Sequence, residues 1–287
     1  MQHLFHDHSV WHALLDFQFE AGVDCALEEE PQDRFAIQQE VAAELSAATN
    51  AAQQNTPRAV AAFQTQPAMP RHLQADAAKA PDEVALMARD LARNAQSLDE
   101  LHHLLSEFDG CTLKTSAKNL VFSDGSPTAK IMLIGEAPGA EEDRIGKPFV
   151  GRSGQLLDRM LHAIGMDRSS VYIANIVPWR PPGNRTPTPQ EVAICRPFIE
   201  RQIELVNPDL LVTLGGPSTQ NLLNVKEGIL RSRGRWFPYA LPNRSIQALA
   251  TLHPAYLLRQ PLQKRLAWRD FQALRQAFDK SATREQT

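Results

Sequence analysis

Cysteine and long apolar runs are both scarce in this sequence. Its three cysteines, Cys25, Cys111 and Cys195, lie far apart and are odd in number, so they do not form the framework of a disulfide-stabilised secreted domain. Apolar runs such as residues 130–135 are far shorter than a membrane-spanning helix, and no basic-then-apolar signal peptide opens the chain. These absences predict a cytoplasmic protein in a reducing compartment, with no membrane as partner.

Charge is distributed unevenly along the chain. The 287 residues carry a formal net charge of −3 and are 43% hydrophobic, which is enough for a sizeable core and excludes wholesale disorder. Residues 1–100 hold 6 Lys and Arg against 16 Asp and Glu (net −10), whereas residues 101–287 hold 24 against 17 (net +7). Segments of opposite sign indicate different roles, and the second is suited to a polyanionic partner.

The first eighty residues differ in composition from the rest. They are acidic and rich in Ala and Gln, and prolines interrupt their small apolar groups, so they can bury little area. We predict that residues 1–80 form a partly disordered extension, with a short helical element in residues 1–30, and that it binds an unknown partner. No scaffold fixes the four histidines at its start, so no metal site is predicted at His3, His6, His8 and His12.

Hydrophobic periodicity predicts an α/β domain after this extension. Apolar residues at helical spacing in residues 81–106 predict one or two lead-in helices, and the domain spans residues 107–280, followed by a tail at 281–287. Short apolar runs alternate with helical patterns, which favours a parallel sheet with helices on both faces. The runs are residues 130–135, 171–177, 210–215 and 246–252, and the helical patterns are residues 153–164, 189–206, 217–223 and 262–278.

Two loops beyond predicted strands are candidates for a site, because the sites of parallel α/β folds lie beyond the carboxyl ends of their strands. Residues 135–151 form a Gly-rich loop ahead of a helix, which either favours an anion or is a plain strand-to-helix turn. Within it, Phe149 is either an exposed ring that stacks on a flat ligand or a ring packed back into the core. The basic, proline-rich loop at residues 180–185 either holds phosphates or is a solvated connection.

Asn175 lies near the end of the run 171–177, and His253 follows the run 246–252. Asparagine is rare in strands, so the Asn175 amide either reads the edge of a heterocyclic base or bonds nearby backbone. His253 lies where a sheet delivers catalytic groups, although a single histidine can equally be structural. Leu257 and Leu258, with Arg259 beside them, have the composition of a wedge that enters a nucleic-acid stack.

Three segments carry a resemblance to a known family: residues 135–161 (GEAPGAEEDRIGKPFVGRSGQLLDRML), residues 172–189 (YIANIVPWRPPGNRTPTP) and residues 253–259 (HPAYLLR). Together they resemble the family 4 uracil-DNA glycosylases, in order and spacing, over residues 107–278. The resemblance implies a three-layer α/β/α sandwich on a four-stranded parallel sheet. It also implies a monomeric base excision repair enzyme, bacterial-type and nucleoid-associated, that flips uracil out of single- and double-stranded DNA and hydrolyses its N-glycosidic bond.

The resemblance assigns roles to residues of these motifs. Phe149 would stack on uracil, Asn175 would read the base and His253 would donate to uracil O2. Glu136 would position water or stabilise the cationic sugar, with Glu142 as a second catalytic carboxylate. Further contacts are implied to the substrate at Gly135 and Ala137, and to DNA at Arg180, Arg185, Arg231, Arg233, Arg235, Leu257, Leu258 and Arg259.

One departure from the family concerns its cofactor. Family 4 members usually hold a [4Fe–4S] cluster on four cysteines, and the corresponding positions here are Phe108, Cys111, Trp179 and Cys195. Phe and Trp cannot ligate iron. We therefore predict no cluster and no other cofactor or metal, with Phe108 and Trp179 filling the place as apolar packing.

Two other classes of function compete with the glycosylase. One is a non-catalytic or weakly catalytic DNA-binding scaffold of the same fold, but the joint presence of Glu136, Asn175 and His253 argues against it. The other is a phosphate-handling nucleotide hydrolase, for which the sequence lacks a phosphate-gripping Lys-Ser/Thr pair and a clear set of metal carboxylates.

Overall fold

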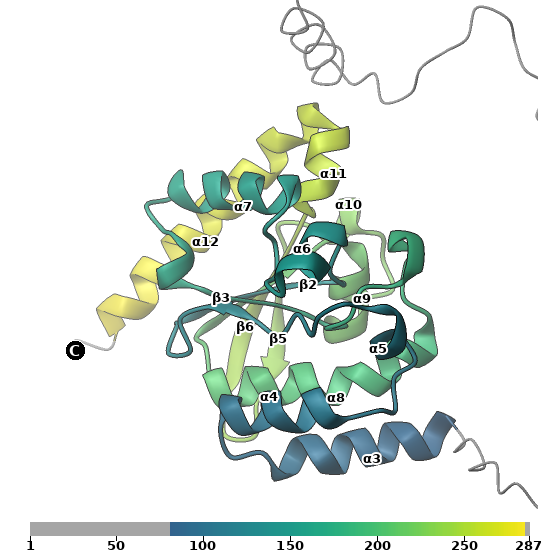
Figure 1. The fold of residues 1–287 in the computed structure, drawn as a ribbon. Helices are drawn as coiled ribbons and strands as arrows, with labels where there is room; N and C mark the ends of the chain where they lie inside the picture. The colour runs from purple at the N-terminus through teal and green to yellow at the C-terminus, as the bar shows by residue number, and fades with distance from the viewer. Residues whose placement is uncertain (1–80, 285–287) are drawn as a thin grey trace, which may run out of the picture. The chain divides into compact units, whose positions relative to one another are not determined.

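The computed structural model describes residues 81–284 (Figure 1). The predicted extension, residues 1–80 with its helical element and its four histidines, lies outside the described residues, as do residues 285–287. Within residues 81–284, no helix is both long enough and apolar enough to span a lipid bilayer.

A six-stranded mixed sheet forms the centre of the fold. The strands are β1 (Asp124–Gly125), β2 (Ile131–Gly135), β3 (Tyr172–Asn175), β4 (Leu210–Leu214), β5 (Trp236–Ala240) and β6 (Ser245–Thr251). Their order across the sheet is β1-β3-β2-β4-β6-β5. The four inner strands are parallel, whereas β1 and β5 are antiparallel to their neighbours.

The prediction of a four-stranded parallel sheet is therefore corrected to six strands in a mixed sheet. The four apolar runs correspond to the inner strands, and β2, β3 and β4 are buried along their whole length. The edge strands have no such pattern. β1 has only two residues, and β5 is only partly buried and contains Pro238, a residue that sheets tolerate at their edges.

Helices of one layer cover the first face of the sheet. They are α3 (Pro81–Asn94), α4 (Leu98–Glu107), α5 (Leu113–Ser116), α8 (Pro189–Val206) and α9 (Gly216–Leu223). A capping box starts α8, because Thr188 Oγ1 accepts from the N–H of Glu191 at 3.2 Å and the Glu191 carboxylate accepts from the N–H of Thr188 at 2.7 Å. Leu101 and Leu105 of α4 are completely buried, so the lead-in helices of residues 81–106 belong to the core.

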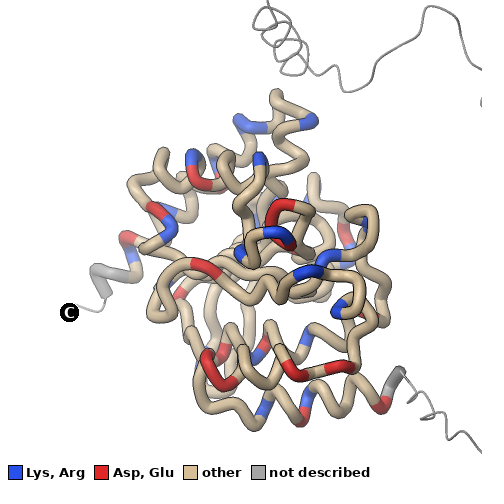
Figure 2. Tube along the Cα trace, in the orientation of Figure 1, with Lys and Arg blue, Asp and Glu red and all other residues tan. Residues whose placement is uncertain are grey.

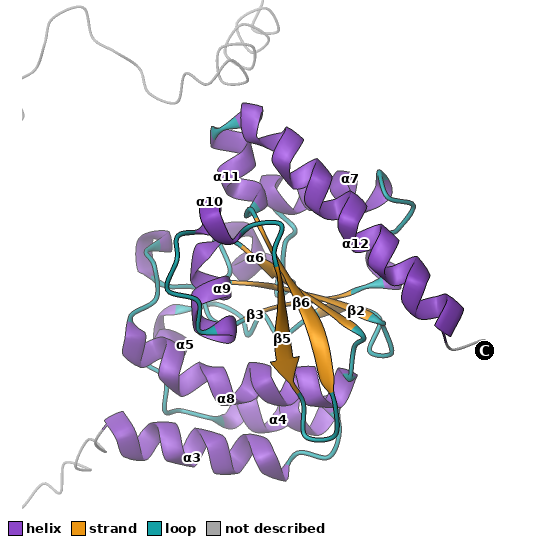
Figure 3. Ribbon diagram, turned by 180° about the vertical axis from the view of Figure 1, so that it is seen from behind, coloured by secondary structure: helices purple, strands orange, loops and turns teal. Residues whose placement is uncertain are grey.

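Helices of a second layer cover the opposite face, as the view from behind shows (Figure 3). They are α7 (Arg152–His162) and α12 (Lys264–Arg284), with the short α6 (Ala140–Ile145), α10 (Ile229–Ser232) and α11 (Pro254–Arg259) near the strand ends. Leu157 of α7 and Phe271 of α12 pack with Leu133 of β2. The last helix extends to Arg284, past the expected end at residue 278 and into the expected tail at 281–287, where no apolar pattern marks it.

Basic and acidic residues are interspersed over the described part of the chain, and one group of basic residues lies around α11 (Figure 2). Arg259, at the end of α11, is followed by Lys264 and Arg265 at the start of α12, and all three are exposed. Exposed Asp99 and Glu100 lie on α4, in the helical layer at the opposite end. A polyanion would therefore meet favourable charge near α11.

Candidate active site

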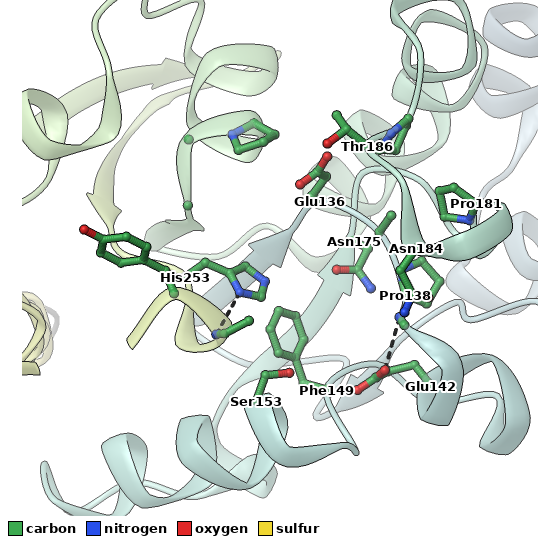
Figure 4. A pocket seen from close by; sticks show the side chains of 18 of the residues that line it. Glu136, Pro138, Glu142, Phe149, Ser153, Asn175, Pro181, Asn184, Thr186 and His253 are labelled. Carbon is green, nitrogen blue, oxygen red and sulfur yellow. Dashed lines mark hydrogen bonds between the residues drawn. The ribbon is translucent and has the colours of Figure 1, made fainter. Parts of the chain in front are cut away.

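A pocket opens at the carboxyl ends of β2, β3, β4 and β6 (Figure 4). Its volume is about 620 Å³, enough for a heterocyclic base and part of its sugar. Parallel strands diverge into loops at this edge, which is why side chains distant in sequence meet here. Eight of the predicted site residues line it: Glu136, Ala137, Glu142, Phe149, Asn175, Arg185, His253 and Arg259.

Asn175 places an unpaired amide oxygen in this pocket. It is the last residue of β3, it is 4% exposed, and none of the described residues donates a hydrogen bond to its Oδ1. Gly135, its partner in the β2–β3 register, makes the room: a Cβ there would lie 2.4 Å from Asn175 Oδ1. Leaving a buried acceptor unpaired costs about 1–3 kcal/mol, so this oxygen is suited to a ligand that donates to it.

His253 is held as a neutral donor. It follows β6 and caps α11, with Nδ1 accepting from the N–H of Ala255 at 3.1 Å. Burial, with the positive charge of Arg259 nearby, lowers the pKa of His253 to about 4. The ring is therefore neutral near pH 7, and since Nδ1 is an acceptor, the proton is on Nε2 and can be donated.

Phe149 forms the wall between the pocket and the core. Its ring lies 5.5 Å from the His253 ring at an interplanar angle of 32°. The sequence left an exposed stacking ring and a core ring as alternatives. The side chain is only 4% exposed and packs with Leu157, yet it lines the pocket, so a ligand would meet the ring without any need for it to emerge.

The two acidic candidates of the first loop differ in what their oxygens do. Glu136 is half-buried, and its Oε1 is buried without a hydrogen-bond partner within the described part of the chain. Burial raises the pKa of this carboxyl above its ordinary value, and a hydrogen bond with Thr186 offsets part of that rise. The Glu142 carboxylate instead accepts from Gly139 N at 3.1 Å, Val150 N at 3.0 Å and Gly151 N at 2.9 Å. Glu136 is thus free to act on a ligand, whereas the geometry of Glu142 favours a role in holding the loop.

The predicted DNA contacts separate into surface and interior side chains. Arg231 and Arg259 are exposed. Arg185 forms two hydrogen bonds with Glu191, at 2.7 and 2.9 Å, Arg180 donates to Asn184 Oδ1 at 2.7 Å, and Arg235 pairs with Glu227 at 2.6 Å. These last three arginines each pair with a neighbouring side chain, yet part of each guanidinium group stays accessible to a ligand.

Two of the predicted DNA contacts lie in the interior instead. Arg233 is 16% exposed and its guanidinium pairs with Asp270, a carboxylate that is 1% exposed and also accepts from Thr251. Leu257 is 1% exposed and packs with Leu252 under α11, so it could enter DNA only by emptying that cluster. For both residues the structure favours a structural role over the expected contact; Leu258 is half-buried.

Thr186 and Tyr256 are two of the pocket residues that sequence reasoning missed. Thr186 hydrogen-bonds to Glu136 across the pocket, and Tyr256 lines the side next to His253. Tyr256 could have been found, because it stands inside the segment 253–259, where attention fell on the two leucines. Thr186 lies in a polar loop that gives no periodic signal.

The four positions of the cysteine set come together in the core. Phe108, Cys111, Trp179 and Cys195 are all buried in one cluster, with the two sulfur atoms 3.7 Å apart. Contact with Cys111 and burial raise the pKa of Cys195, which keeps that thiol neutral. Two thiols flanked by two aromatic rings do not fit a four-thiolate cluster, and residues 81–284 contain no group of three or more His, Cys, Asp or Glu able to hold a metal.

Comparisons with known proteins match this part of the chain. The model of the uracil DNA glycosylase superfamily matches residues 122–272. The Type-4 uracil-DNA glycosylase of Thermotoga maritima is 41% identical over 166 residues, covering 56% of this chain and 85% of that protein. The Type-4 uracil-DNA glycosylase of Saccharolobus solfataricus is 39% identical over 187 residues, covering 63% and 87%. A Type-5 uracil-DNA glycosylase of Thermus thermophilus is 35% identical over 115 residues, covering 34% and 52%.

Proposed function

The chain belongs to the uracil-DNA glycosylase superfamily, and we propose that the pocket beyond β2, β3 and β6 is where it hydrolyses the bond between uracil and DNA. The activity is that of a uracil-DNA glycosylase in DNA repair. The unpaired Oδ1 of Asn175, facing a cavity shared with Phe149 and His253, is the observation that carries the assignment of the site.

Base recognition rests on the Asn175 amide. Uracil presents an N–H donor at N3 and an acceptor at O4, so Oδ1 accepts from N3 and the amide N–H donates to O4. Cytosine presents the inverse pattern and would leave both buried groups unpaired. Phe149 offers its ring to the flat face of the base, and Gly135 leaves the space in which the two side chains meet.

Bond cleavage needs charge stabilisation at both fragments. The flipped nucleotide develops negative charge on the uracil ring, and His253 donates from Nε2 to uracil O2 without first having to lose a proton. Positive charge develops on the sugar, where the Glu136 carboxylate stabilises it and positions the attacking water. Protonation removes the negative charge of Glu136, so this role weakens as the pH falls toward the raised pKa of that carboxyl.

DNA is held outside the pocket by exposed basic side chains. Arg259 lines the rim and Arg231 is exposed, while Arg180, Arg185 and Arg235 keep partly free guanidinium groups for phosphates. Flipping a nucleotide costs a few kcal/mol, which these contacts supply in part. Leu258 and Arg259 brace the vacated space. The proposal includes action at the chromosome in the cytoplasm, as a monomer and on both single- and double-stranded DNA.

The function proposed here needs no iron–sulfur cluster. The packing of Phe108 and Trp179 with two thiols supports this, since an intact cluster needs four ligands. Purified protein is expected to lack both stoichiometric iron and the broad visible absorbance of such a centre. One cluster's worth of iron and sulfide per chain, bleached by reductant, would overturn the prediction.

The domain organisation follows as a further part of the proposal. The glycosylase domain includes the helices of residues 81–106, because they supply completely buried core residues. The acidic residues 1–80 form an extension that recruits a partner. The alternative function is a DNA-binding scaffold without catalysis. Under this alternative the unpaired oxygens of Glu136 and Asn175 have no role.

Alkali cleavage of an end-labelled oligonucleotide with one uracil tests the function. We expect alkali-labile breaks at the uracil in single- and double-stranded substrates, and none in strands with thymine or cytosine at that position. The His253→Ala variant, at equal protein concentration, is the control against a contaminating glycosylase. Binding without any alkali-labile product would favour the scaffold.

A further inference from the structure

Phe149 has a backbone conformation that is uncommon for a phenylalanine. Its φ is +53°, the left-handed region in which a side chain other than that of Gly, Asn or Asp is uncommon. Such a conformation costs about 1–3 kcal/mol and persists only where the surroundings fix it. Because φ sets where Cβ points, this conformation also decides that the ring lies against Gly135 and His253 in the pocket.

Arg168 fixes the carbonyl side of this residue. It lies in the short 3₁₀ turn Arg168–Ser170, and its Nη2 donates to the carbonyl oxygen of Phe149 while Nη1 donates to that of Pro148 at 3.2 Å. Gly154 of α7 packs so closely that a Cβ there would lie 1.7 Å from the Phe149 oxygen. The carbonyl therefore has one position, between the guanidinium and the α7 backbone.

Glu142 holds the N–H groups that follow Phe149. Its Oε1 accepts from the N–H groups of Val150 and Gly151, the two residues after Phe149. Arg168 thus holds the peptide unit before Phe149 through the Pro148 oxygen, and the unit after it is held at both ends, by Arg168 at the Phe149 oxygen and by Glu142 at the Val150 N–H. This pair of contacts over-determines the backbone at one position in the loop, which is the condition that a strained residue requires.

Arg168 is itself held in place by two carboxylates from different elements. Nε donates to Asp158 of α7 at 2.7 Å and Nη1 to Asp124 of β1 at 2.7 Å, and the side chain is 24% exposed. Burial alone would raise the pKa of Asp124, but hydrogen bonds from Arg168 and Lys147 outweigh it and hold that pKa below its ordinary value. A charged, forked donor is thus locked between the edge strand, α7 and the loop.

We propose that Arg168 is a positioning residue for base stacking: it holds the Phe149 backbone so that the ring is in its stacking position before uracil enters. This inference rests on the proposed function of the pocket. Arg168 does not line the pocket, so its effect on the reaction passes through Phe149. Lysine keeps the charge but lacks the planar fork, so it cannot reach two carbonyls and two carboxylates together.

A double-mutant cycle on uracil excision tests the proposal. We expect Arg168→Gln to lower the single-turnover rate by about 10- to 100-fold, since misplacing a reacting group by about 1 Å can cost 100-fold, with Arg168→Lys in between. In a Phe149→Ala background, the same Arg168→Gln change is expected to lower the rate less than twofold, because the ring it positions is absent. Affinity for DNA with an abasic site should change little.

Arg275→Gln is the matched control. Arg275 also joins a backbone carbonyl to a carboxylate, donating to Ile164 at 3.1 Å and to Asp279 at 3.1 Å, but it lies on α12 away from the pocket. We expect its thermal destabilisation to be comparable and its excision rate to stay within about twofold of the wild type. Melting temperatures of all variants separate loss of folding from loss of positioning.

The outcomes separate this proposal from the proposed function. If the wild-type protein excises uracil and Arg168→Gln lowers the rate equally with and without Phe149, Arg168 is only structural and the inference fails while the function stands. An unchanged rate in Arg168→Gln also overturns it. If the wild-type protein releases no uracil, the function itself fails. Should Arg168→Gln not fold, the cycle is run with Arg168→Lys.

Discussion

Replacing His253 by Ala is expected to lower the single-turnover rate of uracil excision by about 100- to 1,000-fold, the usual loss when one donor to a developing anion is removed. The reason is specific to the ring's environment: Nδ1 is occupied by the N–H of Ala255, so Nε2 is the donor that faces the pocket. DNA affinity should change little, because the phosphate contacts come from other side chains. Rapid-quench measurement with enzyme in excess gives the rate.

The pH dependence of the rate adds a second readout. Because the pKa of His253 is lowered to about 4, the ring is neutral through the range where histidine ordinarily titrates, so the wild-type profile should show no step near pH 6.5. A fall on the acidic side should follow protonation of Glu136, whose pKa is raised, and Glu136→Gln should remove that fall.

The control for the His253→Ala variant is His103→Ala. His103 is exposed on α4, in the layer far from the pocket, where it lies 3.6 Å from Glu107. Its removal is expected to leave the rate unchanged. An unchanged rate in His253→Ala as well would remove His253 from the mechanism, and a profile with a step near pH 6.5 that disappears in His253→Ala would show that the ring is charged during part of the working range.

Asn175→Asp is expected to reduce the preference for uracil over cytosine by about 10- to 100-fold, the range set by one or two unpaired buried groups. At a site that is 4% exposed, burial favours the neutral carboxyl. A protonated carboxyl offers one donor and one acceptor, and either oxygen can carry the proton, so it can pair with N3 and O4 of uracil or with N3 and N4 of cytosine. The variant should therefore still excise uracil, while cytosine becomes a poor but detectable substrate.

Paired rate measurements on uracil and cytosine strands check this prediction. Asn94→Asp is the matched control, since Asn94 is exposed at the end of α3 and the same change of one atom should leave both rates unaltered. If Asn175→Asp slows uracil excision without changing the ratio between the two bases, Asn175 supports the pocket but does not read the base.

The sequence indicated the inner sheet and the strand-end residues because both depend on local pattern. Near-continuous apolar runs predicted β2, β3, β4 and β6, and the rule that sites lie beyond strand ends singled out Asn175 and His253. The edge strands gave no signal, since β1 is two residues long and β5 is only half-buried.

Roles that depend on distant partners could not be predicted in the same way. Arg233 was predicted to contact DNA from its basic segment, and nothing in that segment indicated its pairing with Asp270 of α12. Leu257 had the composition of a wedge, but the packing of α11 against the domain turns it inward. Arg168 sits in an ordinary polar turn, and only the folded loop brings the Phe149 carbonyl to it.

Identification of the released base tests the central claim most directly. The purified full-length protein is incubated with strands that differ only in uracil, thymine or cytosine at one position, and the small-molecule fraction is analysed by chromatography and mass. The account predicts free uracil in an amount equal to the abasic sites formed, with no thymine or cytosine. Binding of the uracil strand without free uracil, or release of the three bases at similar rates, would contradict it.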